Sequence, residues 1–207
     1  MNHPSLAIID YGASNLGSVA KALETLGYSP VISSDPKIIS KAHTLILPGQ
    51  GRCDRGMKCL DDLGLSYVIR NSIEKGKPFL GVCVGLQILF QLSEEGNASC
   101  LGVFPGKVLK FPESEKVPHM GWNQVHLSTK HQALQDIPHD SHFYFVHSYY
   151  VEPEDKGLTA GNTTYGVNFC SVLAKDNVVA TQFHPEKSSK VGLAFYERFL
   201  NFAFGME

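Results

Sequence analysis

Short apolar runs alternate with segments of helical periodicity through the first half of the chain. The apolar runs have the length of strands, and the longer segments repeat their apolar residues at the spacing of one helix face. The predicted strands are 6–9, 31–32 and 44–47, and the predicted helices are 16–26, 35–42 and one or two within 54–75. This alternation is typical of an α/β fold with a mostly parallel sheet and helices on both faces.

The pattern changes after about residue 92, where helical spacing becomes rare. Short β-like segments follow at 106–111, 123–127, 143–151 and 164–182. The last of them contains Asp176-Asn177, two residue types that tolerate left-handed backbone geometry and suit a hairpin turn. A final helix is predicted from about 189 to 202. The C-terminal half of the sheet is therefore expected to be partly antiparallel.

A single cysteine separates two apolar segments near the middle of the chain. Residues 78–82 have the length of a buried strand, and the apolar residues of 84–92 could form a buried helix. A sharp turn from strand to helix would strain the backbone of Cys83 and would require small neighbours, as Gly81 and Gly85 are. The helix N-terminus would favour its thiolate. From this motif alone, a buried structural cysteine is an equally good interpretation.

Two further groups of residues suggest a site at the ends of strands. The loop Pro48-Gly-Gln-Gly51 follows a predicted strand, as Cys83 does, and parallel sheets bind ligands outside the carboxyl ends of their strands. Near the end of the last strand, His184 and Glu186 lie on one face of an extended segment, so the carboxylate could hold the imidazole. Taken alone, this pair is better explained as surface residues around a proline turn, because triad members cannot be recognised from sequence position.

Bulk properties place few limits on function. With 207 residues, 43% of them hydrophobic, and without a linker or repeat, the chain is expected to form one domain, 1–207. A formal net charge of −2 gives no reason to expect nucleic acid or an anionic membrane as partner. The five cysteines form no CxxC pair, and neither a signal peptide nor a membrane-length apolar segment is found. A reducing cytoplasm is the expected compartment.

Together, these motifs resemble the class I (triad-type) glutamine amidotransferases, which pair an elbow Gly-x-Cys-x-Gly with a late His-Pro-Glu. Four further stretches are similar to the glutaminase subunits of imidazole glycerol phosphate synthases: 8–16, 116–123, 144–149 and 182–188. The resemblance covers nearly the whole chain. It implies a glutaminase of histidine biosynthesis that needs no cofactor or metal. Its ammonia would pass to a separate (β/α)8-barrel cyclase subunit, which makes imidazole glycerol phosphate and AICAR.

The resemblance also implies a role for particular residues. Cys83 would be the nucleophile that carries a γ-glutamyl thioester, His184 the general base and acid, and Glu186 its orienter. The oxyanion hole would use N–H groups from Gly49, Gln50 and Gly51 and from Val84. Glutamine would be held by Gln87, Glu95 and the backbone of His147, Ser148 and Tyr149. The partner interface would include Asn15, Trp122, Tyr144 and Lys187.

Some positions depart from the family pattern or allow a plainer interpretation. Gln50 stands where a small aliphatic residue is common, and Val84 where leucine is common. The segment around Glu95 could be a solvated turn, and Trp122, the only tryptophan, could be a core residue. Because ammonia is protonated in water at neutral pH, an apolar rim is expected on the active-site face.

Three other functions remain open at this point. The chain could be the glutaminase subunit of a different or paralogous synthase with the same site. It could be a catalytically silent binding subunit on this fold, although the complete Cys-His-Glu set argues against that. It could also be a cysteine hydrolase that acts without a partner.

Overall fold

The computed structural model describes residues 5–12, 15–127 and 131–206. Its helices are α1 (Leu16–Thr25), α2 (Pro36–Lys41), α3 (Cys53–Asp62), α4 (Leu65–Glu74), α5 (Val84–Gln87) and α6 (Ser189–Phe204). The strands of the first half are β1 (Leu6–Ile9), β2 (Val31–Ser33), β3 (Thr44–Gly49), β4 (Phe79–Cys83), β5 (Leu92–Ser93) and β6 (Ala98–Ser99). Those of the second half are β7 (Gly106–Lys110), β8 (His119–Leu127), β9 (Ser141–His147), β10 (Tyr149–Pro153), β11 (Thr159–Tyr165), β12 (Val167–Lys175) and β13 (Val178–Thr181).

The central sheet is parallel on one side and antiparallel on the other. Strands β2, β1, β3, β4 and β13 lie side by side in that order, and all of these pairings are parallel. From β13 the sheet continues through antiparallel pairings to β12, β10 and β7. Strand β11 also pairs with β12 and leads on to β8 and β9. The predicted α/β class, with a partly antiparallel C-terminal half, is confirmed.

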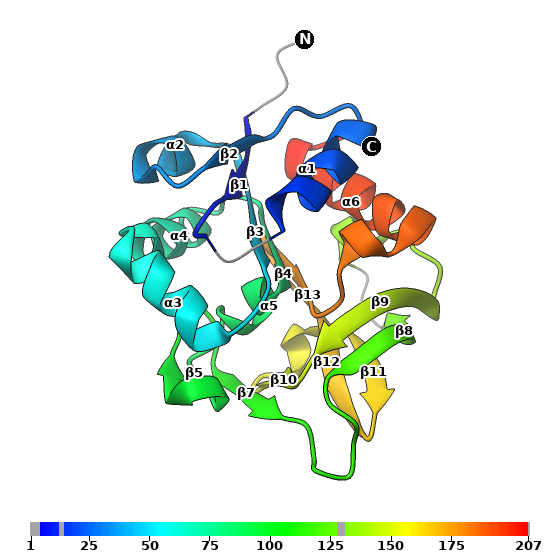
Figure 1. Ribbon diagram of the computed structural model, residues 1–207. Helices are drawn as coiled ribbons and strands as arrows, with labels where there is room; N and C mark the ends of the chain where they lie inside the picture. The colour runs from blue at the N-terminus through cyan, green and yellow to red at the C-terminus, as the bar shows by residue number, and fades with distance from the viewer. Residues whose placement is uncertain (1–4, 13–14, 128–130, 207) are drawn as a thin grey trace.

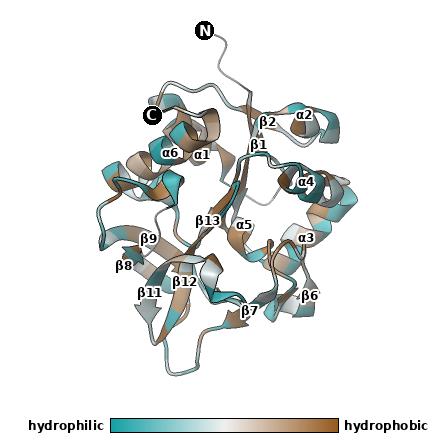
Figure 2. Ribbon diagram, turned by 180° about the vertical axis from the view of Figure 1, so that it is seen from behind, coloured by the Kyte–Doolittle hydropathy of each residue, from teal (hydrophilic) through white to brown (hydrophobic). Residues whose placement is uncertain are grey.

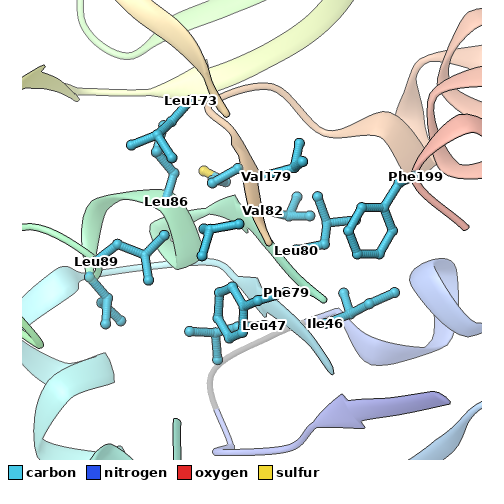
Figure 3. Packing of buried hydrophobic residues seen from close by; sticks show 14 of the residues in the cluster. Ile46, Leu47, Phe79, Leu80, Val82, Leu86, Leu89, Leu173, Val179 and Phe199 are labelled. Carbon is cyan, nitrogen blue, oxygen red and sulfur yellow. The ribbon is translucent and has the colours of Figure 1, made fainter. Parts of the chain in front are cut away.

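Helices cover both faces of the parallel part (Figure 1). Helices α1 and α6 pack together on one side, and α2, α3 and α4 lie on the other. The hydrophobic colour in Figure 2 is concentrated in central strands such as β13, whereas the outer turns of α2 and α4 are hydrophilic. In Figure 3, Leu80 of β4 faces Phe199 of α6, while Phe79 lies beside Leu47 of β3. Alternate residues of β4 thus fill two cores, as expected for a strand buried on both faces.

The segment after Cys83 differs from the prediction. Helix α5 ends at Gln87 instead of continuing to Leu92, and the chain turns so that β5 pairs with β7. Ile88, Leu89 and Phe90 are all fully buried. Because three consecutive residues are apolar, their pattern does not distinguish one buried helix face from a turn that is buried on all sides. Burial of a short apolar run on every side does not distinguish helix from turn.

Other boundaries were also predicted too coarsely. Residues 54–75 form two helices, separated at Gly64, which has a φ of 68°. The run 143–151 is divided at Ser148, and 164–182 contains two turns, one at Gly166 and one at the predicted Asp176-Asn177. The second turn joins β12 and β13 in an antiparallel hairpin, as expected. Among the described residues, no helix combines the length and apolarity required to cross a bilayer.

The predicted strain at the strand-to-helix turn is present. Cys83 has φ 55° and ψ −106°, values that side-chain-bearing residues rarely adopt. The turn also brings α5 against β3, and a Cβ added to Gly85 would lie 2.0 Å from the carbonyl oxygen of Leu47. Glycine is therefore required at position 85, because α5 lies too close to the backbone of β3 for a side chain there.

Replacing Gly85 with alanine should destabilise the fold. The added methyl has to displace backbone atoms of β3, so we expect a loss of about 1–3 kcal/mol in the free energy of unfolding. This loss in the free energy of unfolding is measured by urea denaturation followed by circular dichroism. The matched control is Gly17→Ala in α1, where nothing lies within 4 Å of the new Cβ and stability should be unchanged or slightly higher. Equal stability of the two variants would contradict this account of the turn.

Candidate active site

A cavity of about 310 Å³ opens at the carboxyl ends of the parallel strands. Cys83 ends β4, Gln50 and Gly51 follow β3, and His184 comes three residues after β13. Eleven of the sequence-predicted site residues line the cavity: Gln50, Gly51, Cys83, Val84, Gln87, Glu95, His147, Ser148, Tyr149, His184 and Lys187. Parallel pairing of β3, β4 and β13 brings these distant segments to one edge of the sheet.

Cys83, His184 and Glu186 form a connected set. The Nδ1 atom of His184 lies 2.7 Å from Oε1 of Glu186, and both side chains are almost fully buried. Cys83 also interacts with the ring, and because Glu186 occupies Nδ1, Nε2 is the nitrogen available to the sulfur. Tyr196 of α6 donates to the other carboxylate oxygen of Glu186 at 3.5 Å. The arrangement is that of a nucleophile, a base and a group that orients the base.

The surroundings of His184 favour its charged form. Burial opposes a charge on the ring, but the charge of Cys83 and the hydrogen bonds to Cys83 and Glu186 outweigh it and raise the pKa to about 10. An imidazolium held between a sulfur and a carboxylate can stabilise a thiolate and can later give up a proton.

The backbone around His184 is fixed by the antiparallel half of the fold. The His184 N–H donates to the carbonyl of Tyr144 at 3.0 Å, and the Tyr144 N–H donates to Oγ of Ser188 at 3.0 Å. The Ser188 hydroxyl in turn donates to the carbonyl of His184 at 2.7 Å. Strand β9 therefore holds the short turn η4 (Pro185–Lys187) that follows the histidine.

The loop after β3 has its glycines in two different settings. Gly49 is still part of β3, pairs with Cys83 and does not line the cavity. Gln50 and Gly51 do line it, and Gly51 has a φ of 87°. Of the three loop residues predicted for the oxyanion hole, only Gln50 and Gly51 face the cavity.

The side chain of Gln87 is already engaged. Its Nε2 donates to the carbonyl of Tyr149 at 2.9 Å and to Oε1 of Gln182 at 3.2 Å. The same Tyr149 carbonyl lies 2.8 Å from Nδ1 of His147. Gln87 therefore has its carbonyl oxygen left for a ligand, while its amide fixes the backbone of 147–149 beside the cavity.

Glu95 lies at the edge of the cavity as a half-buried carboxylate. Its Oε2 accepts a hydrogen bond of 2.7 Å from the N–H of Cys53, and its segment forms the turn η1 (Glu95–Asn97). The free carboxylate oxygen suits an ammonium group in the cavity. The alternative that this segment is only a solvated turn does not account for its place in the cavity wall.

Of the residues predicted for a partner surface, Lys187 lies in the cavity wall, whereas Asn15, Trp122 and Tyr144 do not line the cavity. Trp122 is 54% exposed, so it is no core residue, and its ring meets that of Tyr144 edge-on at 6.4 Å. Asn15 precedes α1, a helix that contacts the turn η4, and its amide donates to Ser18. Val117 and Met120, one and two residues from the cavity-lining Pro118, are exposed.

Sequence reasoning missed Gln182, Pro118 and Val146. The Nε2 of Gln182, a buried residue, approaches the sulfur of Cys83 at 3.6 Å, and the other two form apolar parts of the wall. Gln182 could have been found, because alternation in an extended segment predicts that it shares a face with His184, two residues later. Glu186 does not follow this predicted alternation, because Pro185–Lys187 form the turn η4, and it is this turn that brings the carboxylate to the ring. Pro118 and Val146 carried no such signal, since only the pairing of β8 with β9 brings them here.

Two buried histidines beside the cavity are neutral. His119 and His147 lie 2.9 Å apart through their ring nitrogens, and burial lowers the pKa of His119 to about 4 and that of His147 to about 3. Within the described part of the chain, one group could offer three metal ligands, namely His126, His139 and Asp140. It is outside the cavity, and Asp140 is hydrogen-bonded there to both rings.

Known proteins of similar sequence and structure carry consistent descriptions. The family model described as "Glutamine amidotransferase class-I" matches residues 7–201. The imidazole glycerol phosphate synthase subunit HisH of Nitrosospira multiformis is 49% identical, covering 94% of this chain and 96% of its own length. The subunit of that name from Aquifex aeolicus is 48% identical, covering 93% and 94%. Among solved structures, PurLQS from Thermotoga maritima superimposes with a TM-score of 0.74 at 19% identity, covering 97% and 99%.

The His184–Glu186 pair should contribute to stability in a pH-dependent way. The pKa of His184 is raised from 6.5 to about 10 on folding, so the contribution of its charge is fully present below pH 6.5 and is lost as the pH rises toward about 10. Glu186→Gln removes the negative charge, and we expect a loss on the order of 3 kcal/mol near pH 6, where the carboxylate is ionised and the histidine is charged. The difference from the unchanged protein should narrow toward pH 10.

Urea unfolding at a series of pH values measures this difference. The matched control is Glu197→Gln, which removes an exposed carboxylate from the same region of the chain and should have little effect. A loss in Glu186→Gln that stays constant with pH would show that the carboxylate does not stabilise the histidine charge.

Proposed function

Because the chain belongs to the class I glutamine amidotransferase family, with relatives named as HisH subunits of imidazole glycerol phosphate synthase, we propose that it releases ammonia from L-glutamine for such a synthase. The observation that carries the proposal is the connected set of Cys83, His184 and Glu186 at the wall of a cavity large enough for one amino acid. The residues around this set have the chemistry that glutamine requires.

In the proposed reaction the thiolate of Cys83 attacks the side-chain carboxamide carbon of glutamine. The negative charge moves to the carboxamide oxygen, where the N–H of Val84, next to the nucleophile, and an N–H of the Gln50–Gly51 loop would stabilise it. The His184 imidazolium gives its proton to the departing nitrogen, so ammonia leaves and a γ-glutamyl thioester remains. The neutral His184 then takes a proton from water, whose oxygen attacks the thioester and releases glutamate.

The opposite wall of the cavity would bind the amino-acid end of glutamine. Glu95 offers a negative charge to the α-ammonium, and the carbonyl of Gln87 can accept a further hydrogen bond from it. The backbone of His147, Ser148 and Tyr149 would receive the α-carboxylate. Since His119 and His147 are neutral, they place no competing charge behind this wall.

We further propose that the ammonia passes to a (β/α)8-barrel cyclase subunit docked over the cavity. Asn15, Trp122, Tyr144 and Lys187 would lie in that interface, together with the exposed apolar residues Val117 and Met120. Ammonia loses its nucleophilicity when water protonates it, so a rim that excludes water on docking serves the transfer. The joint reaction would yield imidazole glycerol phosphate and AICAR, and the compartment would be the cytoplasm.

Replacing the nucleophile should abolish turnover. Because the three residues act as a unit, Cys83→Ser is expected to lower kcat for glutamine by about 10⁴-fold or more, whereas Cys59→Ser should leave it unchanged. A glutamine-mimicking electrophile should alkylate Cys83 and spare Cys53, Cys59, Cys100 and Cys170. Peptide mapping after inactivation checks this. Loss of activity with the label on another cysteine would contradict the assignment.

The isolated subunit should be a poor glutaminase that its partner activates. The loop at Gln50–Gly51 can rest without an N–H aimed at the oxyanion, and a missing oxyanion donor costs about 10²- to 10³-fold in kcat. A partner that binds only the loop conformation with an N–H aimed at the oxyanion would restore this 10²- to 10³-fold in kcat. Cyclase with its nucleotide ligand should therefore raise kcat far more than it lowers KM.

Glutamine hydrolysis is measured for the chain alone, with cyclase, and with cyclase plus ligand. Lys187→Ala should reduce the partner-dependent gain, and Lys190→Ala, which removes another exposed lysine three residues later, should not. Full turnover by the isolated chain would show that the loop is already productive without a partner.

A further inference from the structure

Two cysteines outside the Cys83 site lie in contact with each other. The Sγ atoms of Cys53 and Cys100 are 3.4 Å apart and share a hydrogen bond, although 47 positions separate the residues in the chain. Both are free thiols. Cys53 is fully buried at the first turn of α3, and Cys100 is half-buried, directly after β6. The glutaminase chemistry uses neither of them.

This thiol pair joins the two segments that form one side of the cavity. Cys53 comes two residues after Gly51 of the oxyanion loop, and its backbone N–H holds the carboxylate of Glu95 at 2.7 Å. Cys100 ends the short hairpin that contains Glu95, and α3 packs directly against this hairpin. A covalent bond between the sulfurs would therefore connect the loop side of the cavity to its ammonium-binding side.

The two thiols differ in a way that gives each a role in oxidation. Cys100 is the more accessible of the two sulfurs, whereas Cys53 is fully buried. Their shared hydrogen bond lowers the pKa of the Cys100 thiol, and together with burial it raises the pKa of Cys53, so the directions of the two shifts agree with the difference in access. Cys100 is suited to attack an oxidant first, with Cys53 in place to resolve the product.

We propose that Cys53 and Cys100 form a reversible disulfide that weakens the binding of glutamine, an effect that rests on the function proposed above. The oxidant is a low-molecular-weight disulfide. The Cys100 thiolate attacks one of its sulfurs, breaks the S–S bond and expels one thiolate. Cys53, on losing its proton, attacks Cys100 and expels the second. The two cysteines lose two electrons and two protons, and the oxidant becomes two thiols.

Closing the disulfide requires movement at the cavity. The sulfurs have to approach from 3.4 Å to about 2.05 Å, which draws the start of α3 and the end of β6 together. Because the N–H of Cys53 holds Glu95, the carboxylate shifts relative to Gln50 and Gly51. Moving this carboxylate weakens its charge-assisted hydrogen bond to the α-ammonium, an interaction worth about tenfold or more in affinity, so we expect glutamine affinity to fall about tenfold.

The test removes the reactive nucleophile so that only the other cysteines can respond. The full chain carrying Cys83→Ala is equilibrated with bis(2-hydroxyethyl) disulfide, digested and mapped by mass spectrometry, and its affinity for glutamine is measured by calorimetry. We expect a peptide linked through Cys53 and Cys100 and a Kd raised about tenfold, both reversed by dithiothreitol. Adding Cys100→Ser should abolish both effects, and adding Cys59→Ser, a half-buried cysteine on the same helix as Cys53, should change neither.

The two parts of the experiment separate this proposal from the proposed function. Absence of the linked peptide, or a linked peptide with an unchanged Kd, would overturn the disulfide as a control of the site. If the reduced Cys83→Ala chain does not bind glutamine at all, the proposed function fails instead, and the linked peptide alone decides whether the thiol pair is oxidised.

Discussion

The sharp turn at Cys83 is the constraint on which the site depends. A left-handed φ on a cysteine is unfavourable, and it persists because β4 is buried on both faces and α5 is pressed against the backbone of β3. The same contact leaves no room for a side chain at Gly85. The packing of the central strands therefore stabilises the strained backbone of Cys83 and keeps its sulfur at the carboxyl edge of the sheet, at the N-terminus of α5. Parallel pairing of β3 and β13 with β4 then decides which loops stand beside that sulfur.

The charge balance of the site comes from the antiparallel half of the molecule. His184 is nearly inaccessible to water, yet its neighbours favour the imidazolium, because a sulfur and a carboxylate lie on its two sides. The carboxylate of Glu186 is held by Tyr196, and the turn that carries it is fixed to β9 through Ser188 and Tyr144. The nucleophile thus belongs to the parallel part of the sheet, and its base is positioned by the additional strands. A reacting set assembled from two parts of the fold is sensitive to anything that moves one part relative to the other.

Exposed apolar residues occur close in sequence to the cavity wall. Val117 and Met120 lie one and two residues from Pro118, which lines the cavity together with the polar residues Glu95 and Lys187. The contact between Cys53 and Cys100 connects α3, the helix after Gln50 and Gly51, to the turn that carries Glu95. The segment after β3 and the turn that carries Glu95 are therefore connected to each other through this thiol pair and through the N–H of Cys53.

The sequence by itself determined the alternation of strands and helices, the strained cysteine and the partnership of His184 with Glu186, because each depends on local periodicity or on neighbours in the chain. It also indicated, through family resemblance, most of the residues that line the cavity. Only the tertiary structure decided that α5 stops at Gln87 and that the side-chain amide of Gln87 is already occupied. It alone brought Cys53 to Cys100 and Pro118 to the cavity. These outcomes depend on contacts between segments far apart in sequence, for which a local pattern carries no signal.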